Sequence, residues 1–306
     1  MSNFDSLNDK YAIGDAVRLA AGPGDLPQVE VDNELSRAEI CLHGGHVRCW
    51  GRQNERPVLW ESAASRFALG APIRGGIPVC WPWFGAHPTD ADQPAHGFAR
   101  VLPWELRATR ALPRGHQVVL GLTDSEATRS MWPHAFDLEL EVTVGHQLHV
   151  SLRATNLSEE SMGFTAALHS YFAVSDVASI AVRGLADTDY IDTVGGARNR
   201  HTQLGAIQVR EETDRIYLDT DTECFVDDPG WQRCLRIGKQ GSRTTVVWNP
   251  WVAKSQRMPD FGDHEYPEML CVETANAEND ARILAAGASA VLGTVISVEP
   301  LTGGNA

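Results

Sequence analysis

Hydrophobic residues alternate with polar ones along several short stretches of the chain, and no long stretch has the period of a helix. In residues 137–144 every second position is Leu or Val. After Gly145 and His146 the same alternation resumes through residues 148–152. A period of two on both sides of a short turn predicts a β-hairpin with one buried face.

The same pattern predicts further strands elsewhere, with Gly- and Pro-rich turns between most of them. The stretches are residues 38–42, 118–122, 165–169, 243–248, 269–274 and 291–298. Many short strands joined by turns are typical of a β-sandwich or barrel. We therefore predict one all-β domain over residues 1–306, with a few short helices in its connections. Residues 281–290 are the candidate for one helical turn, and the first residues and 301–306 are expected to be frayed.

Composition and net charge limit the kinds of partner and substrate that the protein can bind. The 306 residues are 43% hydrophobic and carry a net charge of −14. Nucleic acid is an unsuitable partner for so acidic a surface, because its phosphates require basic residues. An anionic substrate would need a local cluster of basic side chains within the acidic exterior.

The location of the protein is predicted from what the sequence lacks. No charge-free stretch is long and apolar enough to span a membrane, and the first residues do not resemble a signal peptide. The six cysteines contain no CxxC pair and are expected to be buried free thiols. Free thiols without an export signal predict a cytoplasmic protein.

Residues 71–100 are the first segment dense in candidate chemistry. Aromatic residues and glycines stand there between Arg74, His96 and Arg100. Aromatic faces pack on the apolar side of a sugar ring, and guanidinium groups bind phosphate with two hydrogen bonds. Taken singly, Trp81 and Trp83 fit a hydrophobic core better than a ligand site.

Four further residues are candidates for catalysis or binding, although their local sequence does not establish such a role. His169 closes one predicted strand and Glu273 lies near the end of another. A histidine can exchange a proton near neutral pH, and a partly buried glutamate becomes a better base. Asp214 could accept a hydrogen bond from a sugar hydroxyl, and Lys254 could add positive potential. On local context alone, a structural role is favoured for His169 and an exposed strand-end position for Glu273. A solvated surface role is the alternative for Asp214 and fits Lys254 equally well.

Motifs for other chemistries are absent from the sequence. There is no P-loop, no GxGxxG, no GxSxG and no HExxH. His43 and His46 have the spacing of a metal pair, but no further ligands accompany them at useful spacing. We therefore expect neither a metal nor a cofactor.

Six motifs in order along the chain resemble the glucose-6-phosphate 1-epimerase (hexose-6-phosphate mutarotase) family, a branch of the aldose 1-epimerase superfamily. They run from about Gly44 to Ala277 and read PIRGGIPVCWPWFG, HGFAR, ALHSYF, DRIY, WNPW followed by Lys and Asp, and VETAN. The resemblance implies a galactose-mutarotase-like β-supersandwich of antiparallel sheets. It also implies that His169 and Glu273 are the catalytic histidine and glutamate.

The resemblance further implies which residues bind the substrate. Arg74 and Arg100 match family arginines near the substrate, where the resemblance places its phosphate. His96 matches a histidine beside the sugar ring, and Asp214 matches a substrate-binding aspartate. Family members can carry Gln before the HGFAR histidine, where this chain has Ala95, which puts one substrate contact in question.

These residues predict an isomerase that exchanges the α and β anomers of a D-hexose 6-phosphate without a cofactor. Glu273 would remove the proton of the C1 hydroxyl while a protonated His169 donates to the ring oxygen, which opens the ring. Three alternatives stay open: an aldose 1-epimerase acting on unphosphorylated hexose, a carbohydrate-binding protein without activity, and a polysaccharide lyase or hydrolase, since similar supersandwiches serve those enzymes. The sequence does not fix the oligomeric state, and a monomer is compatible with it.

Overall fold

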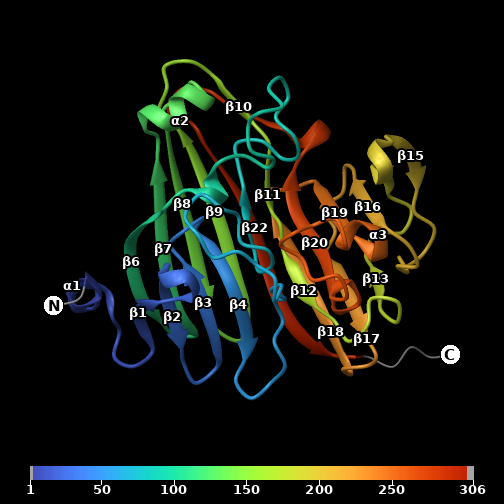
Figure 1. Ribbon diagram of the computed structural model, residues 1–306, viewed down its shortest axis with the longest axis horizontal. Helices are drawn as coiled ribbons and strands as arrows, with labels where there is room; N and C mark the ends of the chain where they lie inside the picture. The colour runs from blue at the N-terminus through green and yellow to red at the C-terminus, as the bar shows by residue number, and fades with distance from the viewer. Residues whose placement is uncertain (1–2, 302–306) are drawn as a thin grey trace.

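The alternating stretches of the sequence form antiparallel strands in the computed structural model, which describes residues 3–301 (Figure 1). The predicted hairpin consists of β8 (Phe136–Val144) and β9 (Leu148–Asn156), with Val144 opposite Leu148. Buried and partly exposed residues alternate along both strands. The prediction of an all-β fold is therefore confirmed.

Two large sheets dominate the described residues. The first, which we call the back sheet, has the order β13-β17-β18-β22-β9-β8-β7-β6. Its other strands are β13 (Ala181–Arg183), β17 (Cys224–Asp228), β18 (Arg233–Gln240), β22 (Ser289–Pro300), β7 (Gly115–Thr123) and β6 (Glu105–Leu112).

The second large sheet, which we call the site sheet, has the order β15-β14-β16-β19-β20-β11-β5, and β12 also pairs with β20. Its strands are β15 (Asn199–Thr202), β14 (Asp189–Asp192), β16 (Thr213–Tyr217), β19 (Thr244–Asn249), β20 (Met269–Asn276), β11 (Ala166–Leu168), β5 (Val79–Cys80) and β12 (Tyr171–Ala173).

Smaller elements complete the fold. A four-stranded sheet contains β1 (Val17–Ala21), β2 (Pro27–Asp32), β3 (Ser36–Cys41) and β4 (His46–Arg52), and β10 (Met162–Phe164) pairs with β21 (Arg282–Leu284). The helices are α1 (Asn3–Tyr11), α2 (Glu126–Met131) and α3 (Trp251–Ser255), with 3₁₀ turns η1 (Pro23–Asp25), η2 (Ala99–Val101), η3 (Val194–Gly196), η4 (Tyr266–Glu268) and η5 (Glu278–Asp280). Among the described residues, no helix is both long and apolar enough to cross a membrane.

One hydrophobic core lies between the sheets. It joins Val272 of the site sheet, Leu140 of the back sheet and Ile40 of the four-stranded sheet. Strand β20 contacts β22, and β3 contacts β8, so the site sheet and the four-stranded sheet lie over the back sheet (Figure 1). The inner face of the site sheet is thereby buried, which leaves its outer face for a binding site.

Two local predictions were wrong. Residues 281–290 contain β21 and the start of β22 in place of a helical turn, because Ile283 pairs with Gly163 in a ladder that local sequence does not reveal. The first residues were expected to be frayed, but Asn3–Tyr11 form α1. Of the tail, residues 302–306 lie outside the described range.

Candidate active site

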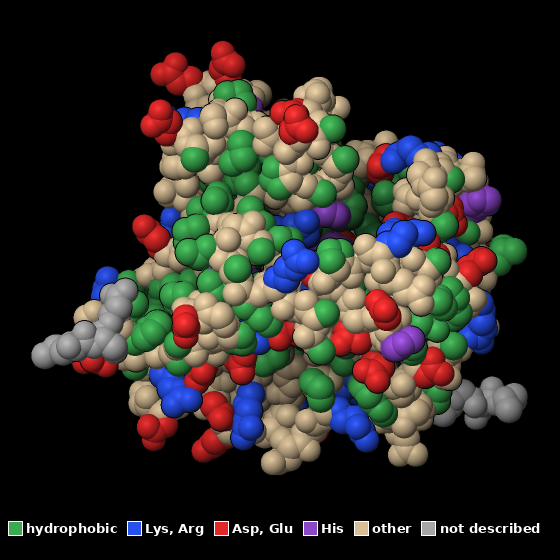
Figure 2. All heavy atoms as spheres, in the orientation of Figure 1, with side chains coloured by type: hydrophobic (Ala, Val, Ile, Leu, Met, Phe, Trp, Pro, Cys, Tyr) green, Lys and Arg blue, Asp and Glu red, His purple; other side chains and the backbone are tan. Residues whose placement is uncertain are grey.

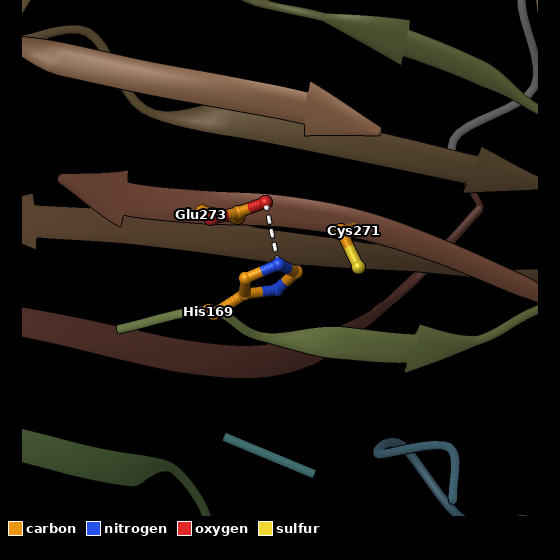
Figure 3. Close-up of side chains that lie close together, drawn as sticks. All are labelled: His169, Cys271 and Glu273. Atoms are coloured by element: carbon orange, nitrogen blue, oxygen red, sulfur yellow. Dashed lines mark ion pairs between the residues drawn. The ribbon is translucent and has the colours of Figure 1, made fainter. Parts of the chain in front are cut away.

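The alternation of side chains along β20 determines which residues face outward. Leu270 and Val272 belong to the core between the sheets, so Cys271 and Glu273 point to the opposite face. Figure 3 shows these two side chains leaving the same strand toward the ring of His169. An apolar strand thus carries a carboxyl group into a buried position, where Glu273 is 2% exposed.

The register of the neighbouring strands brings further side chains of the site to the same face. On β19, Val246 is opposite Glu273 and Trp248 is opposite Cys271. On β16, Asp214 is opposite Trp248. Side chains that are adjacent across strands lie close together, so residues distant in sequence meet on the outer face of the site sheet.

His169 and Glu273 form a buried polar pair on this face. The imidazole Nε2 lies 3.4 Å from the carboxyl Oε1. His169 follows the end of β11, and its backbone N–H donates to the carbonyl of Pro78. The ring of Tyr171 stacks on the imidazole at 4.8 Å between centroids, with 9° between the planes. The histidine is therefore fixed in orientation from its backbone and from one ring face.

The pair lies at a cleft of about 210 Å³. Its lining residues are Arg74, Phe84, His96, His169, Asp214, Val246, Trp248, Lys254, Met258 and Glu273. Larger cavities of about 770, 630 and 430 Å³ lie elsewhere, and the His–Glu pair lines none of them. Pockets for drug-sized ligands usually exceed 300 Å³, so this cleft suits a small, polar ligand such as a monosaccharide.

Several polar atoms around the cleft are buried and lack partners. Among the described residues these include His169 Nδ1, Glu273 Oε2, and the Nε atoms of Arg74 and Arg100. Buried polar atoms are almost always hydrogen-bonded in proteins. The unpartnered atoms of His169 and Glu273 lie at the cleft itself, where a ligand or water can complete their hydrogen bonds. Figure 2 shows basic and histidine side chains together at a hollow of the molecule.

His96 reaches the cleft from the loop between β5 and η2. It has a positive φ of 63°, and the backbone N–H of Gly85 donates to its Nδ1 at 3.3 Å. A neutral imidazole that accepts at Nδ1 carries its proton on Nε2. Gly97 follows with a φ of 75°, where a Cβ would lie 2.0 Å from the carbonyl oxygen of Trp81. Only glycine permits this close passage behind His96.

Arg74 lines the cleft, but carboxylate and hydroxyl groups already hold it. Its Nη1 donates to the Tyr171 hydroxyl at 2.8 Å, and its Nη2 lies 3.1 Å from Asp260 Oδ2. The guanidinium therefore connects the Tyr171 ring, and through it the stacked His169, to Asp260. A ligand phosphate at Arg74 would have to share the guanidinium with Asp260.

Lys254 is similarly paired, whereas Arg100 is not. Lys254 Nζ lies 3.1 Å from Glu212 Oε1 and 3.3 Å from Asp214 Oδ2. Arg100 Nη2 donates to the backbone carbonyl of Ala95 at 2.8 Å, and no carboxylate of the described residues lies within ion-pair distance of it. Arg100 is thus the basic residue of the predicted set whose charge no acidic side chain neutralises.

Burial controls the protonation of the pair. Desolvation, followed by the negative charge of Asp214, raises the pKa of Glu273 well above its ordinary value, although Arg100 opposes this. Desolvation, followed by His96, Arg100 and Arg74, holds the pKa of His169 well below its ordinary value. Burial also lowers the pKa of His96 to about 3, with both arginines adding to the effect. Without a ligand, the site therefore favours a protonated Glu273 beside a neutral His169.

Comparison with known proteins decides the family. The profile of the family described as "Aldose 1-epimerase" matches residues 27–297. A relative from Escherichia coli is 37% identical over 259 residues, covers 85% of this chain and 86% of its own length, and is named "Putative glucose-6-phosphate 1-epimerase". The chain belongs to the aldose 1-epimerase family. It is accordingly an isomerase, a mutarotase acting on sugars.

Solved structures agree with this assignment to the aldose 1-epimerases. A crystal structure from Salmonella typhimurium, described as a "putative mutarotase (YeaD)", has a TM-score of 0.88 and 33% identity, over 95% of this chain and 96% of the other. A galactose mutarotase related enzyme from Lactobacillus acidophilus shares the fold at a TM-score of 0.73 and 14% identity, over 90% and 98% of the two chains. The expected galactose-mutarotase-like architecture of antiparallel sheets is confirmed.

The structure brings most of the residues selected from the aldose 1-epimerase motifs to one cleft. The residues that line it are Arg74, His96, His169, Asp214, Lys254 and Glu273. Arg100 is not among the lining residues, although its charge acts on His96, His169 and Glu273.

Sequence analysis did not select some residues that shape this cleft. Phe84 and Met258 line it, while Tyr171 and Asp260 hold Arg74 in place. Phe84 and Tyr171 stand within the quoted motifs, so their position next to selected residues was the available signal. For Asp260 the only signal was its place in the run that begins with WNPW.

Proposed function

We propose that this aldose 1-epimerase family member interconverts the α and β anomers of a D-hexose 6-phosphate, with glucose 6-phosphate as the first candidate. The observation that carries the proposal is the buried His169–Glu273 pair at the floor of a monosaccharide-sized cleft. The names of the curated relatives support the choice of substrate.

The proposed mechanism needs two proton transfers and no net change of the enzyme. Glu273 takes the proton of the C1 hydroxyl while protonated His169 donates one to the ring oxygen, and the ring opens to the aldehyde. After rotation about C1–C2, His169 takes back the proton from the C5 hydroxyl, and Glu273 returns one to the carbonyl oxygen on the other face. Each positioned transfer contributes roughly 10²–10⁴-fold to the rate.

Substrate binding has to shift the proton of the pair, because the ligand-free site favours protonated Glu273 and neutral His169. Sugar hydroxyls that donate to Glu273 stabilise its ionised form and lower its pKa. A phosphate dianion near His169 favours the imidazolium and raises its pKa. A phosphorylated sugar would thereby create the protonation state that ring opening requires.

Arg100 and Arg74 are the proposed partners of the phosphate. Arg100 is supported by its charge, which no carboxylate of the described residues neutralises. Arg74 is supported by its position in the cleft, where it would exchange Asp260 for phosphate oxygens. His96, Asp214 and Lys254 are proposed to contact the sugar hydroxyls, with His96 donating from Nε2.

A second candidate function follows from one specific observation. Arg74 and Lys254 are both paired with carboxylates, and a site of balanced charge also suits a neutral sugar. An aldose 1-epimerase acting on unphosphorylated hexose is therefore the alternative.

Two broader proposals accompany the function. We propose that the chain acts as one mutarotase-like domain, supported by the core that joins its sheets. We also propose a cytoplasmic location, which the six free cysteines favour.

Anomer-exchange NMR on glucose 6-phosphate and on glucose, with purified protein, tests the proposal. The account predicts accelerated exchange of the phosphorylated sugar and little effect on glucose. Acceleration of glucose alone would favour the alternative. No acceleration of either sugar, or of galactose and mannose 6-phosphates, would indicate a carbohydrate-binding protein without activity and would overturn the proposal.

A further inference from the structure

A thiol group lies next to the His–Glu pair, and the proposed reaction does not use it. Cys271 precedes Glu273 by two positions on β20 and therefore points to the same face of the sheet. One donor atom each from His169, Cys271 and Glu273 lies within 4.8 Å of the other two (Figure 3). Cys271 itself is 0% exposed.

His169 and Glu273 contact each other through Nε2 and Oε1, and each keeps a second donor atom that is free of partners in the described part of the chain. Among the described residues, His169 Nδ1 and Glu273 Oε2 are buried without a hydrogen-bond partner. Thiolate, imidazole and carboxylate are the three ligand types that zinc takes from proteins, at about 2.0–2.3 Å. Tetrahedral binding at these lengths places donor atoms roughly 3.3–3.8 Å apart, so closure requires only that the side chains approach by about 1 Å.

We propose that His169, Cys271 and Glu273 form an inhibitory site for Zn²⁺, with water as the fourth ligand. The proposal rests on the proposed function, since it assigns a regulation to the same pair. On binding, Cys271 and the protonated Glu273 each release one proton to solvent, so that the thiolate and the carboxylate coordinate the ion. The two negative ligands then balance the charge of the ion within a buried environment.

A bound metal would inhibit ring opening because it would occupy the lone pairs of the catalytic pair. A zinc ion bound by His169 and Glu273 takes up the electron pairs with which they accept protons. The ion and the sugar would also compete for one space, because both residues line the cleft. The cleft supplies the route by which the ion reaches the cluster. Hard cations such as Mg²⁺ prefer oxygen ligands and are poorly suited to a thiolate and an imidazole.

The direct test is cobalt binding, because Co²⁺ reports a bound thiolate by a charge-transfer band in the near ultraviolet. Wild type, Cys271→Ala and Cys80→Ala are titrated with Co²⁺ and with Zn²⁺. Cys80 is the matched control because it is also 0% exposed and lies on the same sheet, outside the cluster. We expect the band and one tight Zn²⁺ equivalent in wild type and Cys80→Ala, and neither in Cys271→Ala.

The second readout is the ratio of exchange rates with and without Zn²⁺ for each protein. Zn²⁺ should reduce the rate at least tenfold in wild type and Cys80→Ala, and much less in Cys271→Ala, while Mg²⁺ has no effect. An unchanged cobalt band in Cys271→Ala, or no band in wild type, would overturn the proposal. Cys271→Ser, whose hydroxyl is a poor zinc ligand, replaces Cys271→Ala if the latter does not fold. Failure of the proposed function would appear separately, as a wild type that binds cobalt but does not accelerate exchange.

Discussion

Replacing Glu273 by Gln should abolish most activity and at the same time stabilise the protein. The amide keeps the size of the side chain but cannot accept the proton of the C1 hydroxyl. Loss of one positioned base costs roughly 10²–10⁴-fold in rate, which corresponds to about 2.7–5.4 kcal/mol of transition-state stabilisation. Binding of the sugar should change much less, because the cleft keeps its shape.

The gain in stability follows from the raised pKa of Glu273. A carboxyl group whose pKa is higher in the folded than in the unfolded state stabilises the fold only while it is protonated. Its contribution is complete below the unfolded value of about 4.3. It is lost as the pH rises from there through the folded pKa, with a slope of up to about 1.4 kcal/mol per pH unit. The amide of Glu273→Gln does not ionise, so the variant does not lose this stability. The difference in unfolding free energy between variant and wild type should therefore grow with pH.

Urea unfolding between pH 4 and pH 9, together with anomer-exchange NMR, measures both effects. The depressed pKa of His169 affects the free energy of unfolding of wild type and variant alike, so its effect largely cancels in the comparison. Glu159→Gln, a change at an exposed position, is the matched control and should alter stability by less than about 0.5 kcal/mol. Parallel pH profiles of wild type and Glu273→Gln would refute the burial argument. A variant rate within tenfold of wild type would refute the role of Glu273 as the base.

Three further predictions concern charge in the cleft. Arg74→Ala should raise the KM for glucose 6-phosphate at least tenfold, since a charged hydrogen bond contributes about 1.5–3 kcal/mol, and should affect glucose less; equal losses for both sugars would contradict a phosphate contact. Asp260→Asn should lower the KM for the phosphorylated sugar, because it removes the carboxylate that competes for Arg74; a higher KM would mean that Asp260 serves mainly to position the arginine. The ring of His169 should remain neutral at pH 5.5 in the free enzyme, since its pKa is depressed, and ¹⁵N NMR that finds an imidazolium there would contradict the desolvation argument.

The parts of the fold that sequence predicted well are those with local causes. The hairpin of β8 and β9 follows from alternation on both sides of a short turn, and its register needs no information from elsewhere. The short β21 was missed because Ile283 is paired with Gly163, a residue 120 positions away. Alanine-rich sequence there favours a helix locally, and the ladder with β10 overrides this preference.

In the candidate site, too, local sequence could not reveal what contacts between distant residues determine. His169 and Glu273 were selected through the resemblance of their motifs, whereas their own contexts favoured a non-catalytic role. The register of β20 and the end of β11 bring them together, which no local pattern reveals. The ion pair between Arg74 and Asp260 joins residues 186 positions apart, so the sequence did not reveal that Asp260 pairs with this arginine.

A crystal structure of Glu273→Gln with glucose 6-phosphate would test the central claim most directly. The account predicts that C1 and the ring oxygen lie within hydrogen-bond distance of residue 273 and His169, with the phosphate on Arg100 and Arg74 and Asp260 displaced. A sugar bound with its anomeric carbon away from the pair, or a phosphate in contact with neither arginine, would contradict the account.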